Sequence, residues 1–422
     1  MTNIINNLNK NYQIIFLSLL LFGLSISIFL KEINLILLES FDLRIIIIYR
    51  ILIIAFSIYF FFNIQKKINF YLTAYLFIIF LFLYNSLFGQ EFFFIVDPLA
   101  FYKSINVSYD NVDIFFQDKN RIIIISVFNV FLPILIFSIS KNFKVDFEKF
   151  KKIGLMICDL FLYSFFIFII YKFIIIQMGL IKLNEAFINL HSMIYILNIH
   201  LILIIDRLKN ITKKFNFKSL LNITLIALCF ILTKSALHMF LSLTSIIIFV
   251  YFERLNIKFL LLFLIIFILL TSICFFIFRY FDFENIHSYF DYWYPGGVLN
   301  SIYVRIMNIQ YFLFYTDNLN IFIGNKIFIN NIYTYPHNIF VDIYICTGIV
   351  GFLIFLFILR HLFKLIKFNY NREKLFLLII LIQSFMFSIF SGFLFTNIIF
   401  NTSLAACLCL FKEKESLITE NS

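Results

Sequence analysis

The sequence has few charged residues, and it lacks the short motifs of several enzyme classes. Charged residues make up 14% of the 422 residues, whereas 63% are hydrophobic. There is no glycine-rich phosphate loop, no G-x-S-x-G, no H-E-x-x-H and no C-x-x-C. The chain therefore has no signature of a P-loop nucleotidase, an α/β-type serine hydrolase, a zinc peptidase or a thiol oxidoreductase.

Cysteine and acidic residues do not form a recognisable metal site. The cysteines lie in hydrophobic runs, without metal-ligand spacing and without the pattern of a disulfide framework. They are Cys158, Cys229, Cys274, Cys346, Cys407 and Cys409. Two acidic pairs, Glu39 with Asp42 and Asp282 with Glu284, each resemble half of a divalent-cation site, but two carboxylates are too few ligands. We expect no metal and no cofactor, and cysteines that serve as small apolar packing residues.

The hydrophobic residues gather in long runs, which predict an all-α, polytopic integral membrane protein. A soluble fold cannot bury so much apolar surface, whereas lipid can solvate it, and a spanning helix needs about 20 apolar residues. About twelve runs qualify. They are 12–30, 45–64, 69–88, 121–140, 154–172, 187–205, 219–233, 236–252, 258–278, 338–359, 374–391 and 394–411. We expect one membrane domain over 1–422 and no cleavable signal peptide, because the first run is long enough to span and lacks a small-residue cleavage site.

The 34 Lys and Arg residues set the expected orientation. Most of them lie in short connectors or tails that share one side of the membrane if the N-terminus is cytoplasmic. Because cytoplasmic loops carry the excess of basic residues, the sequence predicts that both termini are inside. Segments 89–120 and 279–337 then face outward, and the second is a long loop between helices 9 and 10. The net charge of +11 is thereby assigned to the membrane surface and not to nucleic acid.

Two basic residues lie close to the predicted outer ends of spans. Charge within a hydrophobic span is costly and is a functional hypothesis by default. Arg50 lies one or two turns inside the second run, where its side chain either extends to the headgroups or faces a cavity that opens outward. Lys234 separates the seventh and eighth runs. It either marks a hairpin or places its ammonium near lipid phosphates.

The loop 279–337 and the helix after it supply further polar candidates. Arg305 lies in an amphipathic pattern that predicts a helix on the membrane surface. The apolar face of that pattern is formed by Ile302, Ile306, Ile309 and Leu313. His337 directly precedes a span, where Pro336 restricts the local chain and Asn338 can cap the helix. A lone histidine is usually structural, but a side chain at such a position is also suited to acid–base chemistry.

Three parts of the sequence carry a resemblance to a known family. One is the turn LTKSA at 232–236, and the second is Arg305 followed by IGN at 323–325. The third and strongest is PHNIF at 336–340, continued by TGIVGFL at 347–353. Together they resemble the O-antigen polymerase and O-antigen ligase superfamily, whose members commonly show a T-x-S-R-G-like turn, a G-x-G-like element and an H-N…G-x-x-G helix. At the turn, Ala236 stands where the family usually has Arg, and the nearest basic residue is Lys234.

The resemblance covers residues 220–360 and implies a glycosyltransferase-C-like membrane enzyme. Such enzymes transfer an oligosaccharide from undecaprenyl diphosphate to a sugar hydroxyl outside the bacterial cytoplasmic (inner) membrane. It implies that the donor diphosphate is bound by Lys234, Arg305, Arg279 and Arg50, and that His337 accepts the proton of the attacking hydroxyl. Pro336, Asn338 and Gly324 would support these groups. The implied partners are the lipid-linked oligosaccharide, membrane lipids and, as a candidate, a chain-length regulator.

Three functions stay open at this point. A polymerase, which we favour, uses a second lipid-linked repeat unit as acceptor, whereas a ligase uses the lipid A core, and the motifs do not separate them. A flippase or other transporter of lipid-linked oligosaccharides is the alternative from another class of protein. It should show related halves and polar groups near the middle of the membrane, whereas the prominent polar residues of this sequence gather at one side.

Overall fold

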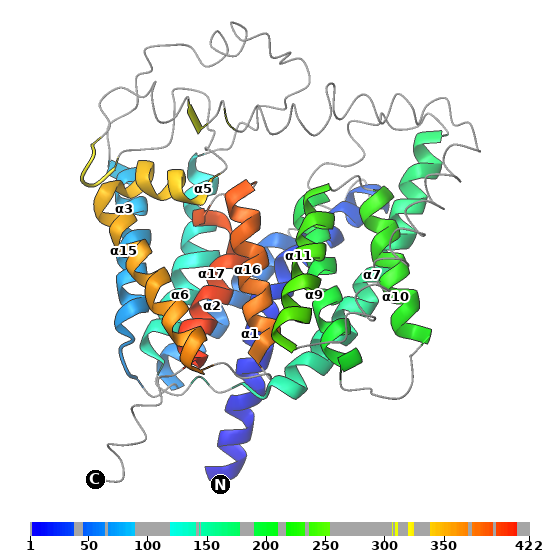
Figure 1. Cartoon of the computed structure of the whole chain (residues 1–422), viewed down its shortest axis with the longest axis horizontal. Helices are drawn as coiled ribbons and strands as arrows, with labels where there is room; N and C mark the ends of the chain where they lie inside the picture. Colours follow the sequence, from blue (N-terminus) through cyan, green and yellow to red (C-terminus); the bar gives the residue numbers. More distant parts are fainter. Residues whose placement is uncertain are drawn as a thin grey trace, which may run out of the picture. The chain divides into compact units, whose positions relative to one another are not determined.

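The computed structural model describes fifteen parts of the chain, and every structural statement below concerns these parts alone. They are residues 2–37, 45–63, 66–88, 119–140, 143, 145–177, 190–209, 217–232, 236–253, 306, 309–310, 320–324, 338–369, 374–390 and 394–411. Within them the chain is helical and forms no strand, apart from one isolated antiparallel bridge between Lys66 and Ser140. The all-α prediction is confirmed for these residues (Figure 1).

The helices coincide with the predicted hydrophobic runs, although α1, α7 and α15 extend beyond them. They are α1 (Thr2–Leu37), α2 (Ile45–Asn63), α3 (Phe70–Phe88), α5 (Lys119–Ile125), the π-helix η2 (Ser126–Phe131), α6 (Leu132–Ile139), α7 (Phe147–Gln177), α9 (Leu190–Lys209), α10 (Phe217–Leu232), α11 (Ala236–Glu253), α15 (Ile339–Asn369), α16 (Leu375–Phe390), the 3₁₀ turn η4 (Leu394–Thr396) and α17 (Ile398–Leu410). Every predicted run except 258–278, which lies outside the described residues, coincides with helix. The predicted break at Lys234 falls between the end of α10 and the start of α11.

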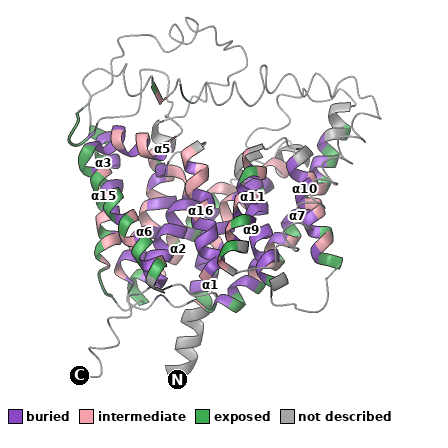
Figure 2. Cartoon of the chain, in the orientation of Figure 1, coloured by how far each residue is buried: buried purple, intermediate pink, exposed green. Residues whose placement is uncertain are grey.

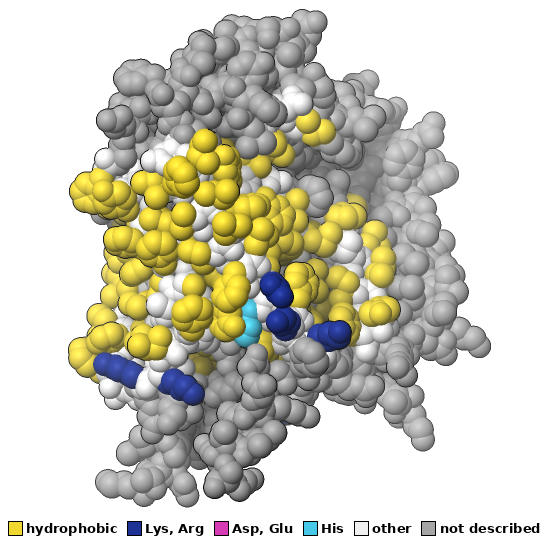
Figure 3. All heavy atoms as spheres, turned by 60° about the vertical axis from the view of Figure 1, so that its left-hand side comes forward, with side chains coloured by type: hydrophobic (Ala, Val, Ile, Leu, Met, Phe, Trp, Pro, Cys, Tyr) yellow, Lys and Arg dark blue, Asp and Glu magenta, His cyan; other side chains and the backbone are white. Residues whose placement is uncertain are grey.

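Six helical segments among the described residues are long and apolar enough to cross a membrane. They are Asn11–Ile33, Ile45–Asn63, Phe70–Phe88, Ile122–Ile139, Phe147–Lys172 and Ile339–Lys367. Four shorter apolar helices accompany them. Many of their large apolar side chains are exposed, as in the surface of Figure 3, where lipid would cover them. The protein is thus an α-helical, membrane-embedded protein, and the number of spans, their orientation and the single domain over 1–422 stay predictions.

The chain divides into two compact units, which we describe separately. Unit 1 contains Met1–Ile53, Lys144–Tyr289 and Asn371–Gln383, and unit 2 contains Ile54–Phe143, Phe290–Tyr370 and Ser384–Ser422. In unit 1, α9 packs against α1, α7, α10 and α11, so it is buried along most of its length (Figure 2). Phe29 of α1 lies edge-on against three phenylalanine rings of α7. These are Phe161, Phe165 and Phe168, with ring centroids 5.1, 5.8 and 5.4 Å from that of Phe29.

In unit 2, α3 packs against α15 and α6, and α17 packs against α6. Phe82 and Phe395 stack in its core, with ring centroids 4.1 Å apart. The π-helix η2 directly precedes Pro133 at the start of α6. Because proline has no N–H, a helix around it must readjust its hydrogen bonds, and a π-turn is one such adjustment.

The described cysteines are all buried, as the sequence predicts. The Sγ of Cys409 lies 3.3 Å from the carbonyl oxygen of Phe137, a weak hydrogen bond that joins α17 to α6. Cys274 lies outside the described residues.

Candidate functional site

Helix α15 is interrupted at Gly348, inside the strongest of the sequence motifs. Gly348 has φ 65° and ψ −167°, which are not helical angles. A side chain is rarely tolerated at such a positive φ, so glycine suits this position. The interruption divides α15 into a half that begins at Ile339 and a half that begins at Ile349.

The turn formed by residues 320–324 fills this interruption. The backbone N–H of Ile349 donates to the carbonyl oxygen of Ile321 at 2.8 Å, and that of Val350 donates to Phe322 at 3.2 Å. The first amides of a helix have no partner within the helix. The turn supplies partners for two of them, which an apolar environment would otherwise leave unsatisfied at a considerable cost.

The close packing of these two segments requires two glycines. Gly324 also has a positive φ, 75°, and a Cβ there would overlap the backbone of Cys346, Thr347 and Gly348. A Cβ at Gly348 would overlap the backbone of Phe322. Gly324, predicted as a supporting residue, is therefore a contact point between the two motif segments.

Asn85 of α3 joins the same two segments. Its Nδ2 donates to the carbonyl oxygen of Ile323 at 2.7 Å and to that of Cys346 at 2.8 Å. The Asn85 side chain is buried, and its bond to Cys346 is made away from water. Sequence reasoning missed Asn85, because its only signal was an amide near the end of an apolar run.

Asn338 caps the start of α15, as the sequence predicts. Its Oδ1 accepts from the N–H groups of Phe340 at 3.1 Å and Val341 at 3.3 Å. Its Nδ2 donates to the carbonyl oxygen of Ile389 at 3.4 Å, which links the start of α15 to the end of α16. The backbone directly after His337 is thus held by side-chain hydrogen bonds.

Asp342, in the first turn of α15, is a buried carboxylic acid that the sequence analysis did not single out. Its side chain has no solvent exposure, and its Oδ2 accepts from the N–H of Leu394 at 3.3 Å. Its Oδ1 has no hydrogen-bond partner among the described residues. An ionisable group in such a setting is costly unless it is used. The feature of the sequence that indicates Asp342 as a candidate is its position, four residues after Asn338 in an otherwise apolar turn.

Neutral polar side chains lie next to Asp342 in unit 2. The Tyr75 hydroxyl donates to Asn401 Oδ1 at 2.6 Å, and Asn401 Nδ2 donates to the carbonyl oxygen of Leu394 at 2.7 Å. Asn397 caps α17 through the N–H of Phe400 at 3.1 Å. Amide side chains therefore hold the start of α17 and the first residue of η4, Leu394, whose N–H donates to Asp342.

Most of the predicted diphosphate ligands and the predicted base lie outside the described residues. These are Lys234, Arg279, Arg305 and His337, and the predicted supporting residue Pro336 lies outside them as well. Of the predicted surface helix, Ile306, Ile309 and Gln310 are described, and they are helical. Arg50 is partly buried in the second turn of α2, beside the buried Tyr49 ring. The predicted convergence of the cations with His337 stays a prediction.

Unit 1 contains a different group of polar residues, which centres on Asp159 of α7. Asp159 Oδ1 lies 2.9 Å from His200 Nε2 and accepts from Asn222 Nδ2 at 2.6 Å. Asp159 Oδ2 lies 2.6 Å from Lys218 Nζ. His200 is buried, so this carboxylate joins α7, α9 and α10 by hydrogen bonds and charge.

A pocket of about 800 Å³ in unit 1 is lined by Asp159, Lys218 and a second ion pair. Lys151 Nζ lies 2.7 Å from Asp206 Oδ2, and both side chains are almost fully buried. Apolar side chains complete the wall, among them Leu155, Met156 and Leu160. The pocket therefore combines fixed charges of both signs with an apolar surface.

The described residues contain no cluster of three or more His, Cys, Asp or Glu side chains suited to a metal ion. The two acidic pairs noted in the sequence lie outside the described residues. The expected independence of metal stays a prediction.

Comparisons with known proteins returned no match. No protein-family model, curated protein or solved structure is similar to this chain.

Proposed function

We propose that the chain is a membrane glycosyltransferase that polymerises an O-antigen or a related surface polysaccharide in the bacterial inner membrane. The observation that carries this proposal is the contact between the turn 320–324 and the interruption at Gly348. These segments contain two of the motif pieces on which the family resemblance rests, and two positive-φ glycines let them pack together. A functional site is built from segments that lie together in space, and these two motif segments, which are separate in sequence, contact each other.

The proposed reaction transfers a glycan from undecaprenyl diphosphate to the sugar hydroxyl of a second lipid-linked repeat unit. The hydroxyl oxygen forms a bond to the anomeric carbon, and the bond from that carbon to the diphosphate oxygen breaks. The electron pair leaves with the diphosphate, whose charge Lys234, Arg305, Arg279 and Arg50 stabilise. The hydroxyl proton passes to His337. Direct displacement inverts the anomeric centre.

The described part of unit 2 suits this role because it fixes the chain immediately after His337. Asn338 is bonded both to the first turn of α15 and to the end of α16. Because His337 directly precedes Asn338, its backbone can take few positions. Correct orientation of a catalytic base contributes much of its rate enhancement. Asp342 follows in the same turn and adds a buried carboxyl group.

The test is a polymerisation assay on protein in nanodiscs with purified lipid-linked repeat units, read as chain length on a gel. We expect His337→Ala to reduce the rate by about 100-fold or more, whereas His361→Ala, at the other end of α15, leaves it nearly unchanged. Arg305→Ala should also abolish most of the activity, with Arg207→Ala as its matched control. Near-normal rates for His337→Ala and Arg305→Ala would remove the base and the diphosphate clamp from the proposal.

A ligase is the alternative within the same class, because it would use the same donor and the same residues. The acceptor distinguishes the two enzymes. If the purified protein elongates a lipid-linked repeat unit, it is a polymerase. If it transfers glycan only when lipid A core is added, it is a ligase.

The Asp159 group is an observation that favours a transporter as the second candidate function. Asp159 lies twelve residues into α7, and it contacts His200 in the middle of α9. Buried ionisable groups within spans commonly mark transport pathways. In a deletion strain, unpolymerised lipid-linked repeat units on the outer face of the membrane would support the enzyme. Their retention on the inner face would support the transporter.

A further inference from the structure

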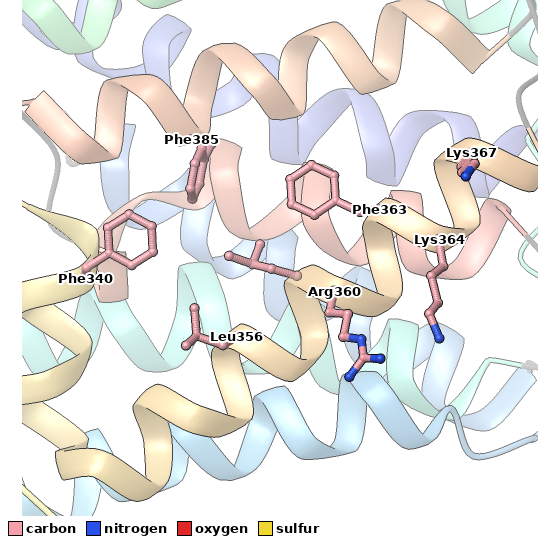
Figure 4. A pocket seen from close by; sticks show the side chains of 8 residues that line it. Phe340, Leu356, Arg360, Phe363, Lys364, Lys367 and Phe385 are labelled. Carbon is pink, nitrogen blue, oxygen red and sulfur yellow. The ribbon is translucent and has the colours of Figure 1, made fainter.

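The C-terminal part of α15 borders an open groove that the proposed reaction does not use. The groove has a volume of about 630 Å³, and all its lining residues belong to unit 2. They are Phe340, Leu356, Leu359, Arg360, Phe363, Lys364, Lys367 and Phe385. Figure 4 shows Phe340 and Phe385 toward one end of this groove and Lys364 and Lys367 toward the other. The groove is therefore apolar along most of its length and cationic at one end.

The cationic end has no acidic neighbour in the groove. Arg360, Lys364 and Lys367 are exposed, and no Asp or Glu lines the groove. Arg360 and Lys364 form no ion pair with any described residue. The one acidic residue of α15, Asp342, is buried near the opposite end of the helix. An anionic group would complement this end of the groove.

The second half of α15 places these cations near headgroup depth. It begins at Ile349, and at about 1.5 Å per residue Lys367 lies about 27 Å along it, close to the thickness of the hydrocarbon core, which is about 30 Å. Lys364 and Arg360 lie about 5 and 10 Å before Lys367, and their long side chains can extend toward the headgroups. Leu356 and Leu359 precede all three cations in α15 and fall within the hydrocarbon region. The groove thus changes from apolar to cationic where a bilayer changes from acyl chain to phosphate.

We propose that this groove binds one anionic glycerophospholipid from the leaflet that contains the C-terminal end of α15. The lipid phosphate lies among Arg360, Lys364 and Lys367, and an acyl chain lies along Phe363, Leu359 and Leu356. The arginine guanidinium can donate two parallel hydrogen bonds to a phosphate, which a lysine cannot. The cations of this site lie in the second half of α15, beyond Gly348, and none of the residues proposed for the glycan transfer lines the groove, so the inference does not depend on that reaction.

The spacing of the cations distinguishes this site from the general excess of basic residues at membrane surfaces. Positions 360, 364 and 367 lie on one face of the helix, and they share that face with Leu356 and Phe363. Lys66 and Lys67 provide a contrast in the same unit. They are exposed on an extended segment and do not line this groove, and the Lys66 ammonium lies over the Phe61 ring, 4.4 Å from its centroid. These two lysines therefore serve as the matched control.

The experiment measures lipid retention by native mass spectrometry, after purified full-length protein is exchanged into micelles that contain phosphatidylglycerol or phosphatidylcholine. We expect one retained phosphatidylglycerol and no preferential retention of phosphatidylcholine. The double variant Arg360→Gln with Lys364→Gln should weaken retention by about tenfold or more. Lys66→Gln with Lys67→Gln, which removes the same charge, should change it less than about twofold. Helix content by circular dichroism verifies that both variants are folded.

Three results would overturn the proposal. One is equal retention of phosphatidylglycerol by the two double variants, since the bound lipid would then not depend on the groove. Another is competition by millimolar inorganic phosphate that removes the lipid completely, since the apolar part of the groove would then contribute nothing. The third is preferential retention of undecaprenyl phosphate over phosphatidylglycerol, which would assign the groove to the carrier lipid. A Phe363→Ala variant that weakens lipid retention without changing phosphate binding would confirm that the acyl chain occupies the groove.

Discussion

The two units manage buried polar groups in different ways. In unit 1 several buried ionisable side chains have charged or polar partners, as in His200 with the half-buried Asp159, and Lys151 with Asp206. In unit 2 the buried polar side chains of the described residues are neutral apart from Asp342, and amides such as Asn85 and the half-buried Asn338 bind backbone atoms. Charge pairs stabilise contacts between helices, whereas amides allow a helix to be interrupted in an apolar setting. Unit 2 therefore tolerates irregular backbone where the motif residues lie, and unit 1 supplies a charged pocket.

This difference can be tested by variants, ranked here by the expected loss of stability. The largest loss should follow from Gly348→Ala. The new Cβ would overlap the backbone of Phe322, and alanine is strained at a φ of 65°. We expect a loss of about 3 kcal/mol or more, measured by chemical unfolding in detergent.

The control for Gly348→Ala is Gly154→Ala in α7. A Cβ at Gly154 would meet only side chains, with Leu203 Cδ1 at 3.1 Å and a Phe22 ring carbon at 3.3 Å, and no positive φ is involved. Side chains can shift where backbone cannot, so the loss should be much smaller. Equal losses for the two variants would contradict the importance of the interruption in α15.

The second variant, Asp159→Ala, tests the charge pairs of unit 1. It removes the partner of a buried histidine and of Lys218, and removing one member of a buried pair usually costs about 3 to 5 kcal/mol. Because the Lys218 side chain is half exposed, we expect about 2 kcal/mol. Glu148→Ala is the matched control, since its side chain is 62% exposed and its pair with Lys151 is longer, at 3.5 Å. A loss below about 0.5 kcal/mol for Asp159→Ala would refute the structural role of the pair.

The third variant, Asn338→Ala, removes the cap of α15 in unit 2. Two backbone N–H groups and one carbonyl oxygen lose their side-chain partner. We expect a loss of about 1 kcal/mol, the usual value for an N-cap residue. Asn338→Ser should recover most of it, because serine can accept from the same N–H groups. If alanine and serine are equally destabilising, the contact with Ile389 is the important one.

The sequence predicts the helices of this protein better than it predicts their interactions. Apolar runs locate the helices, because lipid requires long apolar segments whatever they contact. The runs do not give every end, since α1, α7 and α15 continue into more polar residues beyond the predicted bounds. The cap at Asn338 was also predicted, since it depends only on neighbouring residues. The interruption at Gly348 was not, because its partners, Asn85 and the turn 320–324, are remote in sequence. The same holds for the pair of Asp159 and His200, which becomes visible only when α7 and α9 are packed together.

The last variant, Asp342→Asn, should have the smallest effect on stability and sharpens the comparison most. Asp342 is the exception in unit 2, a buried carboxyl group where the other buried polar side chains of the described residues are neutral. It has one hydrogen bond from Leu394 and no ion pair among the described residues. An asparagine oxygen can accept the same bond without a charge to bury, so stability should change by less than about 1 kcal/mol.

A structural role for Asp342 would therefore predict normal polymerisation by the asparagine variant. If the carboxyl group serves the reaction, its replacement should reduce the rate by about tenfold or more while the protein remains folded. Gln383→Leu is a suitable control, because it removes another buried polar side chain, which donates only to the carbonyl oxygen of Leu241 in unit 1. If the Asp342→Asn variant is stable but inactive and the Gln383→Leu variant is active, the Asp342 carboxyl group takes part in the reaction and is not only a buried structural group.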